Sequence, residues 1–160
     1  MTLAQFNQIW ASTAYPPEPV SEADLRHVEI SLSVRLPGDY RRAVLEVGLP
    51  RPTITLLDAI VERELELQCL GDFYSPTEII EETISWRKIG MPERLIAFAG
   101  DESGNKFCFD ADGLMNGSPE GSAIWFFDHD FGTVDQIAGS FDDWIGAFCR
   151  VEPWRETGAR

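Results

Sequence analysis

The sequence predicts an α+β fold, a single domain built on a mainly antiparallel sheet that is flanked by N-terminal helices and a closing C-terminal helix. Apolar residues recur with the period of a helix in the first third of the chain and again near residue 145. Between these segments lie short apolar runs separated by polar turns that contain glycine, as in antiparallel strands. Helices and strands grouped in this way are typical of α+β domains and not of alternating α/β folds.

Three helices are expected before the sheet. Residues 2–11 place their apolar side chains on one face of a short helix, and the proline-rich residues 15–19 cannot continue it. Residues 21–34 begin with a Ser-x-x-Asp capping box, which satisfies free amides at the start of a helix. A third helix is expected over residues 39–47, and Gly48 suits the left-handed position that often follows a helix.

The period changes to that of strands in the middle of the chain. Glu64 to Leu70 alternates strictly between acidic or amide and apolar side chains, which predicts a strand with one solvated face. Three further strands are expected over residues 95–99, 106–110 and 123–128. Turns are expected at residues 101–104, 112–113 and 116–117.

Two more capping boxes mark helices that flank these strands. Ser75-Pro-Thr-Glu78 combines a box with proline at the first helical position and predicts a helix through Trp86. Ser140-Phe-Asp-Asp143 predicts the closing helix. Its apolar side chains recur every three or four residues, so one face of this helix should lie in the core: Phe141, Trp144, Ile145, Phe148 and Cys149.

The length and composition are those of one soluble domain. The chain has 160 residues, of which 44% are hydrophobic, and no apolar run approaches the roughly 20 residues of a membrane span. The N-terminus lacks the features of a signal peptide, and three widely spaced cysteines indicate reduced thiols in the cytoplasm. We therefore expect a cytoplasmic protein with one domain over residues 1–151 and a flexible tail over residues 152–160.

The charge is strongly negative and unevenly distributed. The chain carries 27 acidic and 13 basic residues, for a net charge of −14. Residues 58–82 hold eight acids with Arg63 as their one basic residue, and residues 101–143 hold ten with only Lys106. Such a surface disfavours nucleic acid and anionic membranes, and it attracts basic proteins. Acidity also serves solubility alone, and that plainer interpretation stays open.

The sequence offers no catalytic or metal-binding constellation. Asp128-His129-Asp130 is expected to lie where a strand becomes a loop, which favours a solvated histidine over a metal site. Asp110-Ala-Asp-Gly113 lacks the later oxygen ligands of a calcium loop, and Gly100–Gly104 lacks the spacing of a nucleophile elbow. We therefore predict that the protein is not an enzyme and needs no cofactor or metal. A hydrolase remains a distant alternative.

Four motifs in order resemble those of the SUKH superfamily, which includes the yeast cell-wall-assembly regulator and many bacterial immunity proteins. The first comprises Ser21, Glu29 and Leu36-Pro-Gly-Asp-Tyr-Arg41. The others are Ile96 to Asp110, the Ile-x-Phe-x-Asp-His-Asp run from 124 to 130, and Ser140-Phe-x-x-Trp-Ile145. The resemblance covers nearly the whole chain.

The resemblance implies a curved sheet flanked by helices and a binding role, since many bacterial members neutralise a protein toxin by direct complexation. We therefore expect a toxin inhibitor whose partner is basic, such as a nuclease. A regulatory or scaffolding adaptor unrelated to toxins is the alternative, and the oligomeric state stays open. The resemblance names no site residues, so charge density beside the predicted sheet selects the expected partner contacts: Glu62, Glu64, Glu66, Asp101, Glu102, Asp128 and Asp130.

Overall fold

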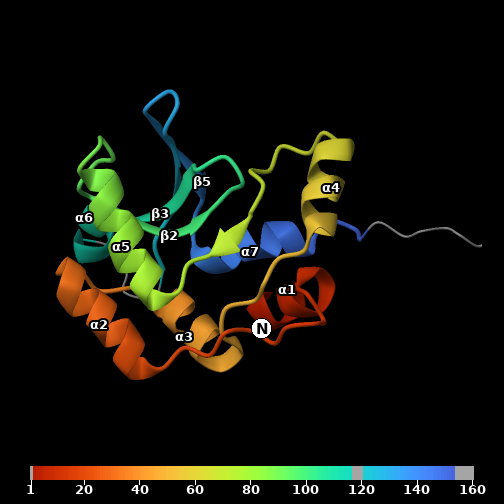
Figure 1. The fold of residues 1–160 in the computed structure, drawn as a ribbon, viewed down its shortest axis with the longest axis horizontal. Helices are drawn as coiled ribbons and strands as arrows, with labels where there is room; N and C mark the ends of the chain where they lie inside the picture. The colour runs from red at the N-terminus through yellow and green to blue at the C-terminus, as the bar shows by residue number, and fades with distance from the viewer. Residues whose placement is uncertain (1, 117–120, 154–160) are drawn as a thin grey trace, which may run out of the picture.

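The fold is a five-stranded antiparallel sheet with helices on both faces (Figure 1). The computed structural model describes residues 2–116 and 121–153, and the following bounds refer to these. The helices are α1 (Thr2–Trp10), α2 (Glu22–Leu32), α3 (Gly38–Val47), α4 (Ile54–Glu62), α5 (Pro76–Arg87), α6 (Ala111–Asn116) and α7 (Phe141–Cys149). The strands are β1 (Asp72–Phe73), β2 (Leu95–Gly100), β3 (Lys106–Asp110), β4 (Ile124–Asp128) and β5 (Thr133–Ala138).

The sheet is a meander, because each strand pairs with its neighbours in sequence in the order β1-β2-β3-β4-β5. Helix α5 packs on β2 and is itself covered by α2, whereas α7 lies on the opposite side together with α1 and α3 (Figure 1). This arrangement confirms the α+β fold class and the helices expected at both ends of the domain. None of the helices in the described residues is long and apolar enough to cross a membrane.

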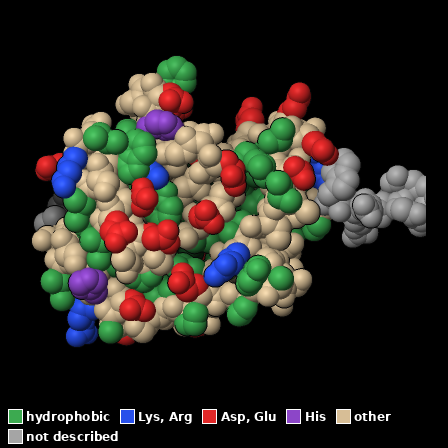
Figure 2. All heavy atoms as spheres, viewed as in Figure 1, with side chains coloured by type: hydrophobic (Ala, Val, Ile, Leu, Met, Phe, Trp, Pro, Cys, Tyr) green, Lys and Arg blue, Asp and Glu red, His purple; other side chains and the backbone are tan. Residues whose placement is uncertain are grey.

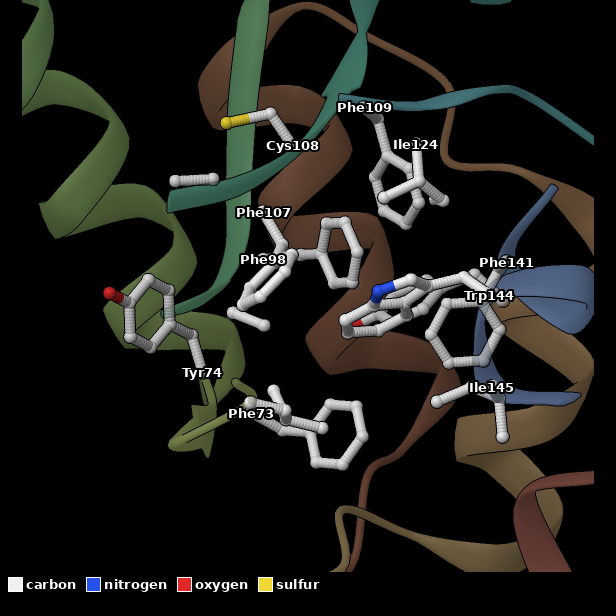
Figure 3. Close-up of a cluster of buried hydrophobic side chains, with 14 of the residues drawn as sticks. Phe73, Tyr74, Phe98, Phe107, Cys108, Phe109, Ile124, Phe141, Trp144 and Ile145 are labelled. Carbon is white, nitrogen blue, oxygen red and sulfur yellow. The ribbon is translucent and has the colours of Figure 1, made fainter. Parts of the chain in front are cut away.

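The core between the sheet and α7 is aromatic. The rings of Phe98 and Phe109, from adjacent strands, stack at 4.1 Å, and the Tyr40 ring meets Phe109 edge-on at 5.1 Å. From α7, the Trp144 ring lies 4.9 Å from Phe107 (Figure 3). All five residues are at most 3% exposed. Edge-on and offset ring pairs of this kind add to the stabilisation from buried area.

Two of the three predicted capping boxes form completely, and the third, at the start of α7, forms only its serine half. The Ser21 and Ser75 hydroxyls each accept the amide three residues later, and the carboxylates of Asp24 and Glu78 accept the serine amides in return. At α7 the Ser140 hydroxyl accepts the amide of Asp143 at 3.1 Å. These bonds satisfy amides that have no partner inside the helix.

The segment between α2 and α3 serves the fold. The Glu29 carboxylate accepts the amide of Leu36 at 2.8 Å and binds the Arg41 guanidinium at 3.0 Å, which fixes the turn between the helices. Gly48 has a φ of +88°, and a Cβ there would lie 2.6 Å from the Glu18 carbonyl oxygen. The residue is therefore glycine for both conformational and steric reasons.

The predicted strand over residues 64–70 is wrong. Helix α4 ends at Glu62, and the amide of Leu65 reaches back to the Ile60 carbonyl while Glu64 adopts a positive φ of 51°. These are features of a helix terminus. The alternation was nevertheless informative, because Leu65, Leu67 and Cys69 are half-buried while Glu64 and Glu66 are exposed.

The structure contains several elements that the sequence analysis did not predict. Strands β1 and β5 and helix α4 were not predicted, and the turn expected at residues 112–113 lies inside helix α6. The Asp110 carboxylate caps that helix by accepting the amides of Asp112 and Gly113. Gly117, in the turn expected at 116–117, and residues 154–160 of the expected tail lie outside the described residues.

Candidate partner-binding surface

The seven predicted contact residues fall into three groups, one at the end of α4, one on the β2–β3 turn and one on the β4–β5 turn. All three places lie along the upper edge of the molecule as drawn in Figure 1. The side chains of Glu62, Glu64, Glu66, Glu102 and Asp130 are exposed there, whereas Asp101 and Asp128 are half-buried. Acidic side chains gather on this view of the surface with few lysines or arginines among them (Figure 2).

Asp101 holds the β2–β3 turn together. Its Oδ1 accepts the amides of Ser103 and Asn105, both at 2.8 Å, and its Oδ2 accepts the Asn105 side-chain amide at 3.0 Å. A carboxylate that accepts three hydrogen bonds inside its own turn has a structural role. Its charge still adds to the field of the edge.

The two turns are joined through Asn105 and His129. The Asn105 Oδ1 accepts the backbone amide of His129 at 3.1 Å and lies 2.7 Å from the ring Nδ1 of the same residue. The His129 ring also packs against Trp86 of α5, with centroids 5.3 Å apart. The β4–β5 turn is therefore fastened to both the β2–β3 turn and α5.

Asp128, His129 and Asp130 lie at the end of β4 and in the turn after it, as expected, but the expectation of a solvated histidine is wrong, because the His129 side chain is 26% exposed and is held by Asn105 and Trp86. The side-chain atoms of these three residues that could ligate a metal ion lie within 4.8 Å of one another. Asp128 Oδ1 already accepts the amides of Asp130 and Phe131, which builds the turn. Asp128 therefore has a structural role in this turn.

A second acidic group, which sequence reasoning missed, surrounds strand β1. Glu18, Asp72 and Glu78 line a cavity of about 300 Å³ together with Arg51. Asp72 is exposed by surface area, yet partial burial by its neighbours raises its pKa above the usual value; the carboxylates of Glu102 and Glu78 raise it further, and Arg51 lowers it. Glu102 on the predicted edge is thus electrostatically coupled to this group. The pairing of β1 with β2 brings the two segments together.

Lys106 is a buried cation beneath this surface. Its side chain is 6% exposed, and its Nζ donates to the Tyr74 hydroxyl at 2.6 Å and to Glu82 Oε2 at 3.2 Å. The same Glu82 oxygen accepts the Trp86 indole N–H at 3.0 Å. One of the few cations beside the acidic surface is therefore buried and paired, and it ties α5 to the sheet.

A cavity of about 480 Å³ lies between the end of α4 and the end of α7. Its lining comprises Arg63, Leu65, Glu66, Leu67, Ala147, Arg150, Val151 and Glu152. This lining contains no serine, cysteine or histidine side chain. Elsewhere Cys108 is fully buried, and burial holds the pKa of its thiol far above the usual range, which makes the thiol unreactive.

Comparison with known proteins gives a family and a fold. A family model described as the SMI1 / KNR4 family (SUKH-1) matches residues 19–147. A solved structure, titled as a protein from Pseudomonas syringae pv. tomato, is similar with a TM-score of 0.53 and 16% identity, over 89% of this chain and 92% of that chain. At this identity the likeness concerns the fold alone. No protein with a curated description matches.

Proposed function

Because the chain belongs to the SMI1 / KNR4 family (SUKH-1), we propose that it is a non-catalytic immunity protein that neutralises a basic protein toxin by binding it directly. The family includes toxin immunity proteins. The observation that carries the proposal within this family is the acidic edge formed by the end of α4 and the β2–β3 and β4–β5 turns. The protein acts in the cytoplasm, where an incoming toxin meets it.

Electrostatics favour a basic partner. Eighteen of the 27 acidic residues lie in two segments of the sequence that contain only Arg63 and Lys106, and the Lys106 ammonium is buried against Glu82. Charge of one sign speeds the encounter with a partner of opposite charge, and it disfavours acidic partners.

The test first searches the genes beside the gene for this chain for a candidate toxin and then uses that toxin. We expect co-expression to protect cells and the purified proteins to form a tight complex. Single charge reversals Glu102→Lys and Asp130→Lys should each weaken the complex, while Glu46→Lys on the exposed side of α3 changes the net charge equally and should not. Loss of protection would be expected with the first two variants only. Absence of binding by the wild type, or equal effects of all three reversals, would contradict the proposal.

The alternative is a regulatory or scaffolding adaptor. Gene context and the same binding experiment distinguish it, because an adaptor would lack a neighbouring toxin gene and would give no protection. The acidic edge itself is compatible with both functions.

A further inference from the structure

Phe131 is the most exposed of the large hydrophobic side chains in the described part of the chain, at 81%. It lies in the turn between β4 and β5, which projects from the sheet at the top of Figure 1. Single exposed apolar residues are common on protein surfaces, so exposure alone says little. Two further properties of this turn separate Phe131 from residues such as Ile30, which is 71% exposed on helix α2.

The first property is that the turn is fixed. Asp128 Oδ1 accepts the amides of Asp130 at 3.0 Å and of Phe131 at 3.3 Å, and the Asp128 carbonyl accepts the amide of Gly132 at 2.8 Å. Gly132 has a φ of +67°, which a residue with a side chain rarely adopts.

The base of the turn is fastened as well. His129 binds Asn105 through its backbone amide and its ring Nδ1, and Asn105 is held in turn by Asp101. An aromatic side chain presented on a fixed backbone loses little conformational entropy when a partner binds it.

The second property is the charge around the tip. The Asp130 side chain is 70% exposed next to Phe131, and Asp135 is exposed on the strand that follows. From Phe107 to Cys149 the sequence contains no lysine or arginine. An apolar anchor inside a negative rim is complementary to an apolar pocket with a positive rim. A second copy of this chain is disfavoured as the occupant, because each copy carries a net charge of −14.

We propose that the β4–β5 turn is the anchor by which this protein holds its partner. Phe131 enters an apolar pocket of a basic protein, and Asp130 and Asp128 meet lysine or arginine side chains on the rim of that pocket. The proposal rests on the proposed function and specifies which part of the acidic edge carries most of the binding energy. Few residues usually dominate such interfaces, and aromatic residues are frequent among them.

The first experiment measures the Kd of the neighbouring gene's toxin for the wild type, Phe131→Ala, Phe131→Tyr and the control Ile30→Ala. We expect Phe131→Ala to raise the Kd at least tenfold, Phe131→Tyr to stay within about threefold of the wild type, and Ile30→Ala to have no effect. Equal Kd values for the wild type and Phe131→Ala would overturn the anchor while leaving the proposed function intact. An equal loss with Ile30→Ala would also overturn it. Thermal unfolding of each variant verifies that the fold is unchanged.

Failure of the wild type to bind that toxin would contradict the proposed function. A second experiment then tests separately whether Phe131 anchors a basic partner. Proteins captured from the native host by the wild type, Phe131→Ala and Ile30→Ala are quantified in parallel. A basic protein that is depleted only with Phe131→Ala, and whose purified form shows the same preference in a binary titration, supports the anchor. Capture that is unchanged by Phe131→Ala, or no capture at all, overturns it.

Discussion

The ring Nδ1 of His129 lies 2.7 Å from the side-chain oxygen of Asn105, and this contact joins the turn between β4 and β5 to the turn between β2 and β3. Asn105 is 9% exposed and is the shared partner of His129 and Asp101. The relative placement of these two turns of the acidic edge therefore depends on one neutral amide side chain.

Replacement of Asn105 with alanine should loosen this edge. Asn105→Ala removes the acceptor for His129 and the side-chain donor to Asp101, and we expect the free energy of unfolding to fall by about 1–3 kcal/mol. Urea denaturation measures this change. Ser103→Ala, at an exposed position in the same turn, should change stability by no more than about 0.5 kcal/mol. Equal stability of the two variants would show that the junction contributes nothing.

Removal of Glu82 should destabilise the fold, because the buried Lys106 ammonium loses its carboxylate partner. Glu82→Ala leaves the Lys106 ammonium, on a side chain that is 6% exposed, without its carboxylate and also deprives the Trp86 indole of its acceptor. Because Glu82 itself is 39% exposed, we expect a loss of about 2 kcal/mol, below the full value for a buried pair. Thermal or urea unfolding provides the measurement. The adjacent exposed residue gives the control, since Glu81→Ala should be nearly neutral; a similar loss there would refute the role of the Lys106 pair.

The capping box at the start of α5 should contribute measurably to stability. Ser75→Ala removes the hydroxyl that accepts the Glu78 amide at 3.2 Å, and we expect a loss of about 1 kcal/mol. Thr77→Ala, at an exposed position in the same turn of the helix, tests whether the effect belongs to the cap. Ser75→Gly should recover most of the loss, because glycine is tolerated at this position. Failure of glycine to recover any stability would argue against a capping effect.

Asp72 should make the protein less stable at neutral pH than at acidic pH. Its pKa is raised in the folded state by burial and by Glu102 and Glu78, so between the unfolded and folded pKa values the folded state binds more protons. The stabilisation from the protonated carboxyl is complete below the unfolded pKa of about 4 and is lost as the pH rises through the folded pKa.

Asp72→Asn should therefore stabilise the protein at pH 7, and its advantage should disappear as the pH falls below about 4. Unfolding curves for the wild type and Asp72→Asn across this range provide the measurement, with Asp58→Asn on the exposed side of α4 as the control. A variant that is less stable than the wild type at pH 7 would contradict the repulsion inferred around β1.

Local signals in the sequence predicted much of the fold. Capping boxes such as Ser75-Pro-Thr-Glu78 fix helix starts through bonds within four residues, so sequence spacing alone reveals them. The alternation over residues 64–70 reported burial correctly but not strand pairing, because alternate side chains also become buried when an irregular segment runs along the surface of the core. Strand β5 has mostly exposed or half-buried residues and gave no apolar signal; its pairing with β4 defines it.

The sequence predicts that the segments at the edge are acidic, but it does not predict how their carboxylates are arranged in space. Glu102 and Asp130 were selected by charge density, and both are exposed. The structural role of Asp101 and the coupling of Asp72 to Glu102 depend on contacts between segments, which no sequence spacing records. Phe131 directly follows the residues expected to lie where a strand becomes a loop, but its exposure becomes apparent only when the neighbouring strands are in place.

The most direct test of the account is the affinity of the wild-type protein for the toxin encoded beside its gene, measured by calorimetry at about 50 and 200 mM salt. An acidic edge that binds a basic toxin predicts a tight one-to-one complex whose affinity falls as salt rises, because ions screen the charges. Glu102→Lys should weaken the complex and reduce its salt dependence. No binding, or an affinity that neither salt nor Glu102→Lys alters, would contradict the account.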